Sequence, residues 1–191
     1  MGDELAAATG SDGGPAIEPT TDALVAEVVA LRPAAGGRGA AARRTPDFDQ
    51  LFDDERRPMV RLAYLLVGSE AQAEEVVQEA FATVYVRWAT LDNPGGFLRR
   101  CVVNGAKGSL RRRALERRKA PPPPDDGTDL GARELLDALA TLPHTMRAVV
   151  VLRFYAGQTQ QEIADTLDLR LGTVKSSLHR GLAKLREVIE P

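Results

Sequence analysis

Two clusters of charged side chains are the first features of this sequence that could do chemistry, and the smaller one is acidic. Glu74, Glu75, Gln78 and Glu79 follow one another at helical spacing and form a single polar stripe. Two carboxylates that face a shared cleft can act as general acid and base. No nucleophile motif, metal-ligand cluster or phosphate-binding loop accompanies them in the chain. The stripe therefore indicates a solvated helix face or a contact for a basic protein partner, and we expect no enzyme activity.

The larger cluster is basic and occupies FLRRCVVNGAKGSLRRRALERRK, residues 97–119. It carries nine lysines and arginines against one acid, Glu116. Like charges at neighbouring helical positions repel one another, and a polyanion relieves that repulsion. Nucleic acid is the commonest polyanion, so DNA or RNA is favoured over a solvated face or an acidic protein partner. Asn104 lies one turn beyond Arg100, where its amide either reads an adenine edge or bonds only to its own backbone.

A third set of functional candidates lies near the C-terminus, in IADTLDLRLGTVKSSLHRGLAKLRE, residues 163–187. At 100° per residue, one face of the second half is apolar, with Val174, Leu178, Leu182 and Leu185. The opposite side and its flank collect small, hydrogen-bonding and cationic side chains, namely Lys175, Ser176, His179 and Arg180. Such a face suits the reading helix of a helix-turn-helix, and a packing hairpin is the alternative.

Composition excludes several classes of protein. The chain has one cysteine, Cys101, and two histidines, so it holds neither a disulfide framework nor a cysteine-rich or histidine-rich metal centre. We therefore expect no metal and no cofactor. No apolar stretch approaches the roughly 20 residues of a membrane span, and the acidic N-terminus does not resemble a signal peptide. These features predict a soluble, cytoplasmic protein.

Helical periodicity runs through the chain and positions the charged groups. It predicts helices over 48–67, 70–88, 97–119, 132–142, 143–155, 159–167 and 173–189. Pro58 either kinks or restarts the first helix, Gly68 ends it, and Ser69 is placed to cap the second. The following ATLDNPGG, residues 89–96, is a loop by composition. Aromatic residues make up only 5% and β-branched runs are scarce, so the fold class is all-α.

Two glycines and one pair of polar residues add local detail. Gly105 and Gly108 weaken the basic helix. Either they allow another backbone to approach closely, or they are flexible points with no packing role. Thr159 and Glu162 have the spacing of a capping box at a helix start.

The predicted helices form two small domains joined by a proline-rich linker. Three helices fall in residues 47–119 and four in residues 132–191, the last two forming the helix-turn-helix. Residues 120–131 include four consecutive prolines, which hold an extended chain.

The N-terminal extension, residues 1–46, is rich in Ala, Gly, Pro and Thr, and we expect it to be disordered. Residues 21–32 are the exception, because Leu24, Val25, Val28 and Leu31 share one face of a short helix. A helix this short is marginal in water and needs a surface to dock on.

Three segments in this order resemble a bacterial sigma-70-type factor of the extracytoplasmic-function (ECF) group, in its actinobacterial style. They are AEEVVQEAFATVYVRW, NPGGFLRRCVVNGAKGSLRRR and LPHTMRAVVVLRFYAGQTQQEIADTLDLRLGTVKSSLHRGLAKLRE. The resemblance covers about residues 48–187 and implies a promoter-specificity subunit of RNA polymerase. The first domain is similar to sigma region 2, which binds core polymerase and the -10 element. The second is similar to sigma region 4, which reads the -35 element as duplex DNA.

Matched position by position, the resemblance implies three sets of contact residues. Core polymerase would meet the acidic stripe, Glu74, Glu75, Gln78 and Glu79. The -10 element would meet the loop residues Asp92 and Asn93, where the family captures a flipped base, and Arg100, Asn104, Lys107, Arg111 and Arg112. The -35 element would meet Arg170, Thr173, Lys175, Ser176, His179 and Arg180.

The chain departs from the family pattern at three positions. Gly108 stands where an acid is frequent, and Asp168 stands where a turn glycine is common. Arg170 stands where a capping serine is common, so we expect the reading helix to begin later, near Thr173.

Two alternative functions are consistent with the residues alone. One is a stand-alone helix-turn-helix regulator, which would bind a palindromic duplex tightly without polymerase. The other is an interaction adapter whose basic surfaces touch no DNA. The resemblance also implies a regulatory partner, an anti-sigma protein, because the polymerase-binding faces of the family are usually occluded. The N-terminal extension could take that role instead.

Overall fold

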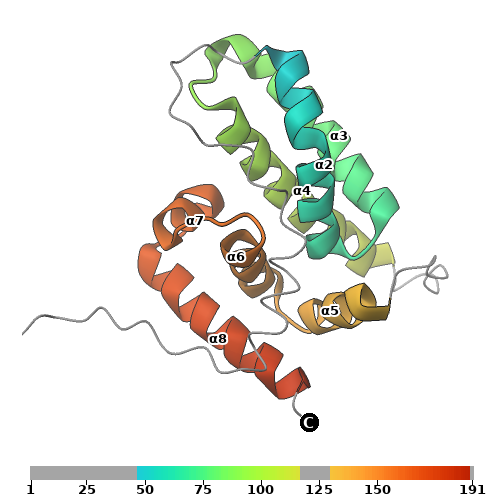
Figure 1. Cartoon of the computed structure of the whole chain (residues 1–191), viewed down its shortest axis with the longest axis vertical. Helices are drawn as coiled ribbons and strands as arrows, with labels where there is room; N and C mark the ends of the chain where they lie inside the picture. Colours follow the sequence, from blue (N-terminus) through green and yellow to red (C-terminus); the bar gives the residue numbers. More distant parts are fainter. Residues whose placement is uncertain (1–46, 117–129, 190–191) are drawn as a thin grey trace, which may run out of the picture.

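The computed structural model describes residues 47–116 and 130–189, and within these ranges it contains helices and no strands (Figure 1). The all-α prediction is therefore confirmed for this part of the chain. The first group of helices is α2 (Phe48–Val67), α3 (Glu70–Arg87) and α4 (Pro94–Glu116), with a 3-10 turn, η1 (Trp88–Thr90), between the last two. The second group is α5 (Leu130–Ala140), α6 (His144–Phe154), α7 (Gln160–Leu167) and α8 (Leu171–Ile189).

Helix α2 ends as its sequence predicts. Gly68 adopts a left-handed φ of 73° and donates its backbone N–H to the Tyr64 carbonyl, the usual end of a helix at glycine. The helix runs through Pro58 without restarting. Ser69 stands at the N-cap of α3 as expected, although its hydroxyl makes no capping hydrogen bond.

The first group packs α2, α3 and α4 together around residues of all three helices, including Leu62, Val76 and Val102, each at most 1% exposed. Gly105 explains how closely α3 and α4 approach, because a Cβ there would lie 3.0 Å from Val76 Cγ1. Gly108, by contrast, faces open space. The two glycines thus differ: one admits a neighbouring helix and the other does not.

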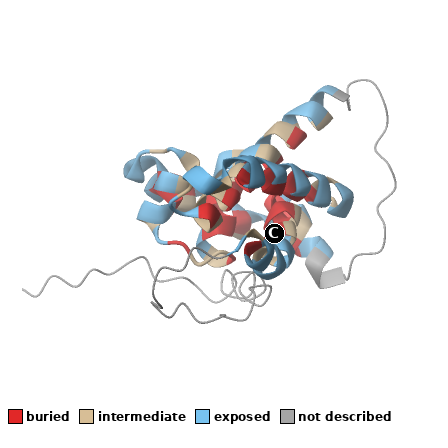
Figure 2. Ribbon diagram, turned by 90° about the horizontal axis from the view of Figure 1, so that it is seen from above, coloured by how far each residue is buried: buried red, intermediate tan, exposed pale blue. Residues whose placement is uncertain are grey.

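The second group is built around α6. Every residue from Ala148 to Leu152 is at most 2% exposed, because α6 contacts α7 and α8 on one side and α2 on another. Gly181 of α8 lets the two helices cross closely, since a Cβ there would lie 3.0 Å from Val150 Cγ2. Burial is therefore continuous through the middle of the molecule, and the outer helix faces are exposed (Figure 2).

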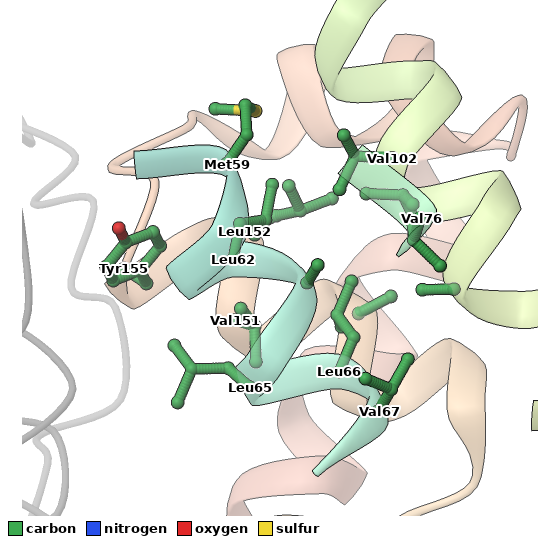
Figure 3. Close-up of a cluster of buried hydrophobic side chains, with 14 of the residues drawn as sticks. Met59, Leu62, Leu65, Leu66, Val67, Val76, Val102, Val151, Leu152 and Tyr155 are labelled. Carbon is green, nitrogen blue, oxygen red and sulfur yellow. The ribbon is translucent and has the colours of Figure 1, made fainter. Parts of the chain in front are cut away.

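The two groups of helices share an apolar interface. Figure 3 shows Met59, Leu62, Leu65 and Leu66 of α2 alongside Val151 and Leu152 of α6 and the neighbouring Tyr155. All of them are at most 3% exposed. Both flanks of α2 are therefore covered, one by its own group and the other by α6.

Hydrogen bonds from two buried side chains reinforce this interface. Arg147 of α6 donates from Nη1 to the Leu66 carbonyl at 2.6 Å, and from Nη2 to the Ala140 carbonyl at 2.9 Å. Tyr155 donates its hydroxyl to the Pro58 carbonyl at 3.0 Å. Burial lowers the pKa of Arg147 and raises the pKa of Tyr155 to about 12. Because Leu66 and Ala140 lie at the ends of α2 and α5, Arg147 supplies donors to carbonyls that the helices leave unpaired.

Residues 120–129 of the proposed linker lie outside the described residues, as do the end of the basic stretch at Lys119 and the N-terminal extension, residues 1–46, with its predicted helix over 21–32. Helix α5 begins at Leu130, so the predicted boundary at residue 131 is two residues too late. None of the helices in the described ranges is long and apolar enough to cross a membrane.

Candidate nucleic-acid interface

Helix α8 buries one side and exposes the other as its periodicity predicts. Val174 and Leu185 are at most 4% exposed and pack within the second group. The predicted -35 contact residues all lie on the exposed surface, namely Arg170, Thr173, Lys175, Ser176, His179 and Arg180. The structure therefore brings this set together at the N-terminal half of one helix and the turn before it.

The start of α8 differs from the prediction. The helix begins at Leu171, two residues earlier than the expected Thr173. The backbone N–H groups of Thr173 and Val174 both donate to the Arg170 carbonyl, at 2.8 and 3.2 Å. Helix initiation here uses a backbone acceptor, so the missing capping serine does not delay it. Asp168 takes the left-handed conformation expected at this turn, with φ 53°.

Two side chains on the exposed face of α8 are held against their own helix. Ser176 donates its hydroxyl to the Thr173 carbonyl at 3.1 Å, and Arg180 donates its Nε to the Ser176 carbonyl at 3.2 Å. These bonds restrict the rotamers of both residues before any ligand arrives. Cations and small hydroxyls presented in this way fit phosphates and base edges in a DNA groove.

The preceding helix, α7, begins with the predicted capping box. Thr159 Oγ1 accepts from the Glu162 N–H at 3.2 Å, and Glu162 Oε2 accepts from the Thr159 N–H at 2.7 Å. Ile163 and Ala164 are at most 4% exposed and face α6 and α8. The cap and the apolar side together set the position of α7, and α7 in turn packs against α8.

Helix α4 exposes a basic stripe. Asn104, Lys107, Arg111 and Arg112 are all exposed, while the opposite side buries Leu98, Val102, Val103 and Ala106. At 100° per residue, Arg100, Asn104, Lys107 and Arg111 fall within a sector of about 60°, and Arg112 lies about 100° from Arg111. Four of the expected -10 residues of this helix thus share one line, and Arg112 flanks it.

Arg100, at the start of that stripe, has a hydrogen-bond partner in the other group of helices. Its Nη2 donates to the Asp165 carbonyl of α7 at 2.8 Å. This bond lies where α4 packs against α7. In this arrangement the first turn of the basic stripe is joined to the helix-turn-helix.

The loop before α4 is shorter than the sequence predicted. Helix α4 begins at Pro94, three residues before the expected residue 97, and η1 occupies Trp88–Thr90. Asn93 Oδ1 accepts from the Gly96 N–H at 2.9 Å, so its side chain caps the helix. The side chain of Asn93 folds so close that a Cβ on Gly96 would lie 2.7 Å from Nδ2. Of the two residues expected to meet a flipped base, Asp92 is exposed and Asn93 is already engaged through its oxygen.

The acidic stripe of α3 is exposed along its length, and its members point in two directions. Glu74 lies toward α2, where Arg56 Nη2 approaches its Oε1 at 3.6 Å. Glu75 and Glu79 lie one turn apart and face away from α2, and Gln78 lies between them and Glu74 around the helix. We therefore place Glu74 at the edge of this surface and the other three on it.

Two exposed residues of α3 were missed by the sequence reasoning. Tyr85 is 66% and Val86 is 84% exposed, and Val86 lies on the same side of α3 as Glu75 and Glu79. The signal was present in the sequence, because both residues fall off the apolar face that includes Val84 and Trp88. The outward side of α3 is thus acidic at its start and apolar at its end.

Neither helical group offers a metal centre in its described residues, since no three His, Cys, Asp or Glu side chains gather there. His144, at the start of α6, has a buried Nε2 without a hydrogen-bond partner. Burial is the main cause that lowers the pKa of His144 to about 4, and the charges of Arg147 and Lys107 add to it. Because Lys107 belongs to α4, the pKa of His144 depends on how the two groups of helices pack together.

Comparison with known families matches both groups of helices. Residues 51–116 match the family described as Sigma-70 region 2, and residues 138–187 match Sigma-70, region 4. The first match spans the acidic and basic helices, and the second spans α6, α7 and most of α8.

Curated relatives of this chain are polymerase sigma factors. The RNA polymerase sigma-E factor of Streptomyces coelicolor is 35% identical over 150 residues, which are 74% of this chain and 85% of the relative. The ECF RNA polymerase sigma factor SigL of Mycobacterium tuberculosis is 30% identical over 166 residues, 80% of this chain and 94% of the relative.

Solved structures of the same fold include the sigma factor RpoE from Bartonella quintana in complex with the anti-sigma factor NepR. It has a TM-score of 0.64 and 20% identity, and the alignment covers 75% of this chain and 97% of that one. CnrH in complex with the cytosolic domain of CnrY has a TM-score of 0.60 and 22% identity, with coverage of 90% and 98%.

Proposed function

The chain belongs to the ECF group of the sigma-70 family, the promoter-specificity subunits of bacterial RNA polymerase, and we propose that it meets polymerase and promoter DNA through three separate helix faces. The observation that carries this assignment is that α4 and α8 each bury an apolar side while presenting a basic side to solvent. Two basic faces on one chain suit a protein that contacts DNA at two places.

Core polymerase is assigned to the outward side of α3, residues Glu75, Gln78 and Glu79 with Glu74 at its edge. Carboxylates on an exposed helix attract a basic partner and accelerate its association. The apolar end of the same side would supply the apolar contact area that gives affinity. The carboxylates alone would not, because charged rim contacts contribute more to association rate than to affinity.

The -10 element is assigned to α4, with Asn104, Lys107 and Arg111 as its central contacts. Lysine and arginine neutralise phosphates, and an asparagine amide can pair with an adenine edge. Asp92 extends this face toward the loop. The amide oxygen of Asn93 is occupied by the helix cap, so only its NH₂ group is left to contact DNA.

The -35 element is assigned to α8, where Lys175, Ser176, His179 and Arg180 enter the major groove and Arg170 and Thr173 meet its edge. The N-terminal half of a reading helix is the part that reaches base edges in a helix-turn-helix. Each substitution that removes a cation contacting a phosphate should reduce the slope of log binding constant against log salt concentration by about 0.9.

Promoter binding requires the two groups of helices to separate. The two elements lie roughly 25 base pairs apart by their names, about 85 Å at 3.4 Å per base pair. Arg100 of the -10 face instead contacts α7, which supports the -35 face. We therefore expect energy transfer between dyes on α4 and α8 to fall when core polymerase binds, and unchanged transfer would refute the opening.

Transcription with purified core polymerase tests the assignment as a whole. The protein should direct initiation at a defined start site, and failure to bind core would refute the function.

The double substitution Lys175→Ala with Arg180→Ala should weaken -35 binding and reduce the slope of log binding constant against log salt concentration by about 1.8. Lys184→Ala is the matched control, since it removes one cation from the exposed C-terminal half of the same helix.

A regulatory protein is also expected to cover part of this chain. Two proteins of the same fold were solved with NepR or with the cytosolic domain of CnrY bound. We extend to this chain the proposal of an anti-sigma partner, which co-purification from the native host would identify.

A further inference from the structure

Exposed apolar side chains at the end of α3 and the start of α2 form an apolar patch that Phe48 covers only in part. Phe52 is 38%, Tyr85 66% and Val86 84% exposed. Ala82 is also exposed, and on α3 it falls between Tyr85 and Val86. Large apolar side chains gathered in this way mark a contact surface more often than chance exposure.

The chain enters the fold at this patch. Phe48, the first residue of α2, has its ring centroid 5.0 Å from that of Tyr85 and 5.5 Å from that of Trp88. The described chain therefore begins, at Asp47, beside the patch. A segment close upstream has the shortest path to it.

One segment of that upstream chain has the complementary pattern. Leu24, Val25, Val28 and Leu31 share one helical face, and a helix so short is stable only on a surface. About 15 residues, 33–47, connect it to α2, and they include three glycines. A flexible linker of this length spans about 20 Å on average and about 50 Å at most, so the patch is well within reach.

Charge favours the same placement. Within the connecting residues 33–47, Arg38, Arg43 and Arg44 stand against one acid, Asp47, and Arg32 directly precedes them. The surface around the patch carries exposed acids on both helices, namely Asp49, Asp53, Glu75 and Glu79. A basic linker beside an acidic surface is attracted to it, and the attraction is strongest at low salt.

We propose that residues 21–32 dock as an amphipathic helix on Phe52, Ala82, Tyr85 and Val86 of the same molecule. A short flexible tether gives an effective concentration on the order of 1 mM. A contact with an intrinsic dissociation constant of about 0.1 mM would then be formed in about nine molecules of ten. Weak contacts are thus sufficient for the docked state to dominate.

Docking there has a consequence that rests on the proposed function. Val86 lies on the same side of α3 as Glu75 and Glu79, the face assigned to core polymerase. The docked segment therefore competes with polymerase, and releasing it should raise the affinity for core by about ten-fold.

Hydrogen exchange of the full chain, without polymerase, tests the docking itself. Amides of residues 21–32 should exchange more slowly than in an unstructured peptide, and Val28→Asp or Val86→Asp should abolish that protection. Ala26→Asp is the matched control, because it adds the same charge on the opposite face of the segment and should leave the protection intact.

Three results would overturn the proposal. They are exchange at the unprotected rate in the wild-type chain, protection that survives Val86→Asp, and protection that disappears on dilution, which would indicate docking between two copies. Core binding is then measured separately: Val28→Asp should raise affinity about ten-fold and Ala26→Asp should not. If no variant binds core at all, the proposed function fails while the exchange result still decides the docking.

Discussion

Replacing Arg147 tests whether one buried cation holds the two groups of helices together. The residue is 9% exposed, and its guanidinium donates to the carbonyls of Leu66, Ala140 and Leu142, at 2.6, 2.9 and 3.4 Å. Among the described residues no carboxylate lies within ion-pair distance of it. Its charge is therefore stabilised by backbone carbonyls, two of them at helix ends and one in the turn between α5 and α6.

The cost of Arg147→Met follows from those bonds. Each buried carbonyl left without a donor costs about 1–3 kcal/mol. Relief of the desolvation of the guanidinium offsets part of that cost, because buried charges are themselves unfavourable. We expect a net loss of about 3 kcal/mol in the free energy of unfolding, and a fall of about 6–12 °C in Tm for a chain of this size.

Urea unfolding followed by far-ultraviolet circular dichroism and by tryptophan fluorescence measures this loss. Trp88, the sole tryptophan, reports on the first group of helices, while dichroism reports on both. Because Arg147 joins the end of α2 to the end of α5, the two signals should separate in the variant even if they coincide in the wild type.

Arg153→Met is the matched control for this prediction. Arg153 lies on the same helix and donates to the Gln158 carbonyl at 3.0 Å, but it is exposed. Its removal should cost less than about 1 kcal/mol, since solvent replaces the missing donor. If both variants lose the same stability, the reasoning about buried helix-end carbonyls is wrong.

Three further predictions concern single residues. Thr159→Ala removes one half of the capping box of α7 and should cost about 1 kcal/mol in thermal unfolding; a loss no larger than that of the exposed Thr145→Ala would contradict it. Asp168→Gly relieves the left-handed φ of 53° and should add about 0.5 kcal/mol, so a lower Tm would count against strain at this turn. Burial lowers the pKa of His144 to about 4, so between pH 6.5 and 4 the unfolded chain binds the proton more readily. Unfolding free energy should accordingly fall as pH drops through this window, and a pH series in which His144→Gln has the same slope as the wild type would refute the assignment.

The sequence predicted helix ends well where the end depends only on residues next to it in the chain. Gly68 and the Thr159–Glu162 pair stand where the sequence predicted a helix end and a helix start. Both depend on one residue type or on a spacing of three residues. The outward faces of α4 and α8 were likewise predictable, because helical geometry alone decides which residues share a side.

Helix starts that depend on a folded loop were predicted less well. Helix α4 begins at Pro94 because Asn93 caps it, and that cap requires the side chain of Asn93 to fold against Gly96. Helix α8 begins at Leu171 because the Arg170 carbonyl accepts two N–H groups. Composition identifies the loop residues but not the turn they adopt. The contact roles of Asp92 and Asn93 stay predictions.

By itself the sequence determined that the chain is helical, which helix faces are basic or acidic, and which family it belongs to. These properties follow from residue order, because charge and periodicity are read along one helix at a time. Tertiary structure decided that α6 covers the second flank of α2, that Arg147 closes the ends of two helices, and that Arg100 turns toward α7. A buried leucine such as Leu65 carries no mark of which helix will cover it, since apolar burial is not directional and many partners satisfy it equally.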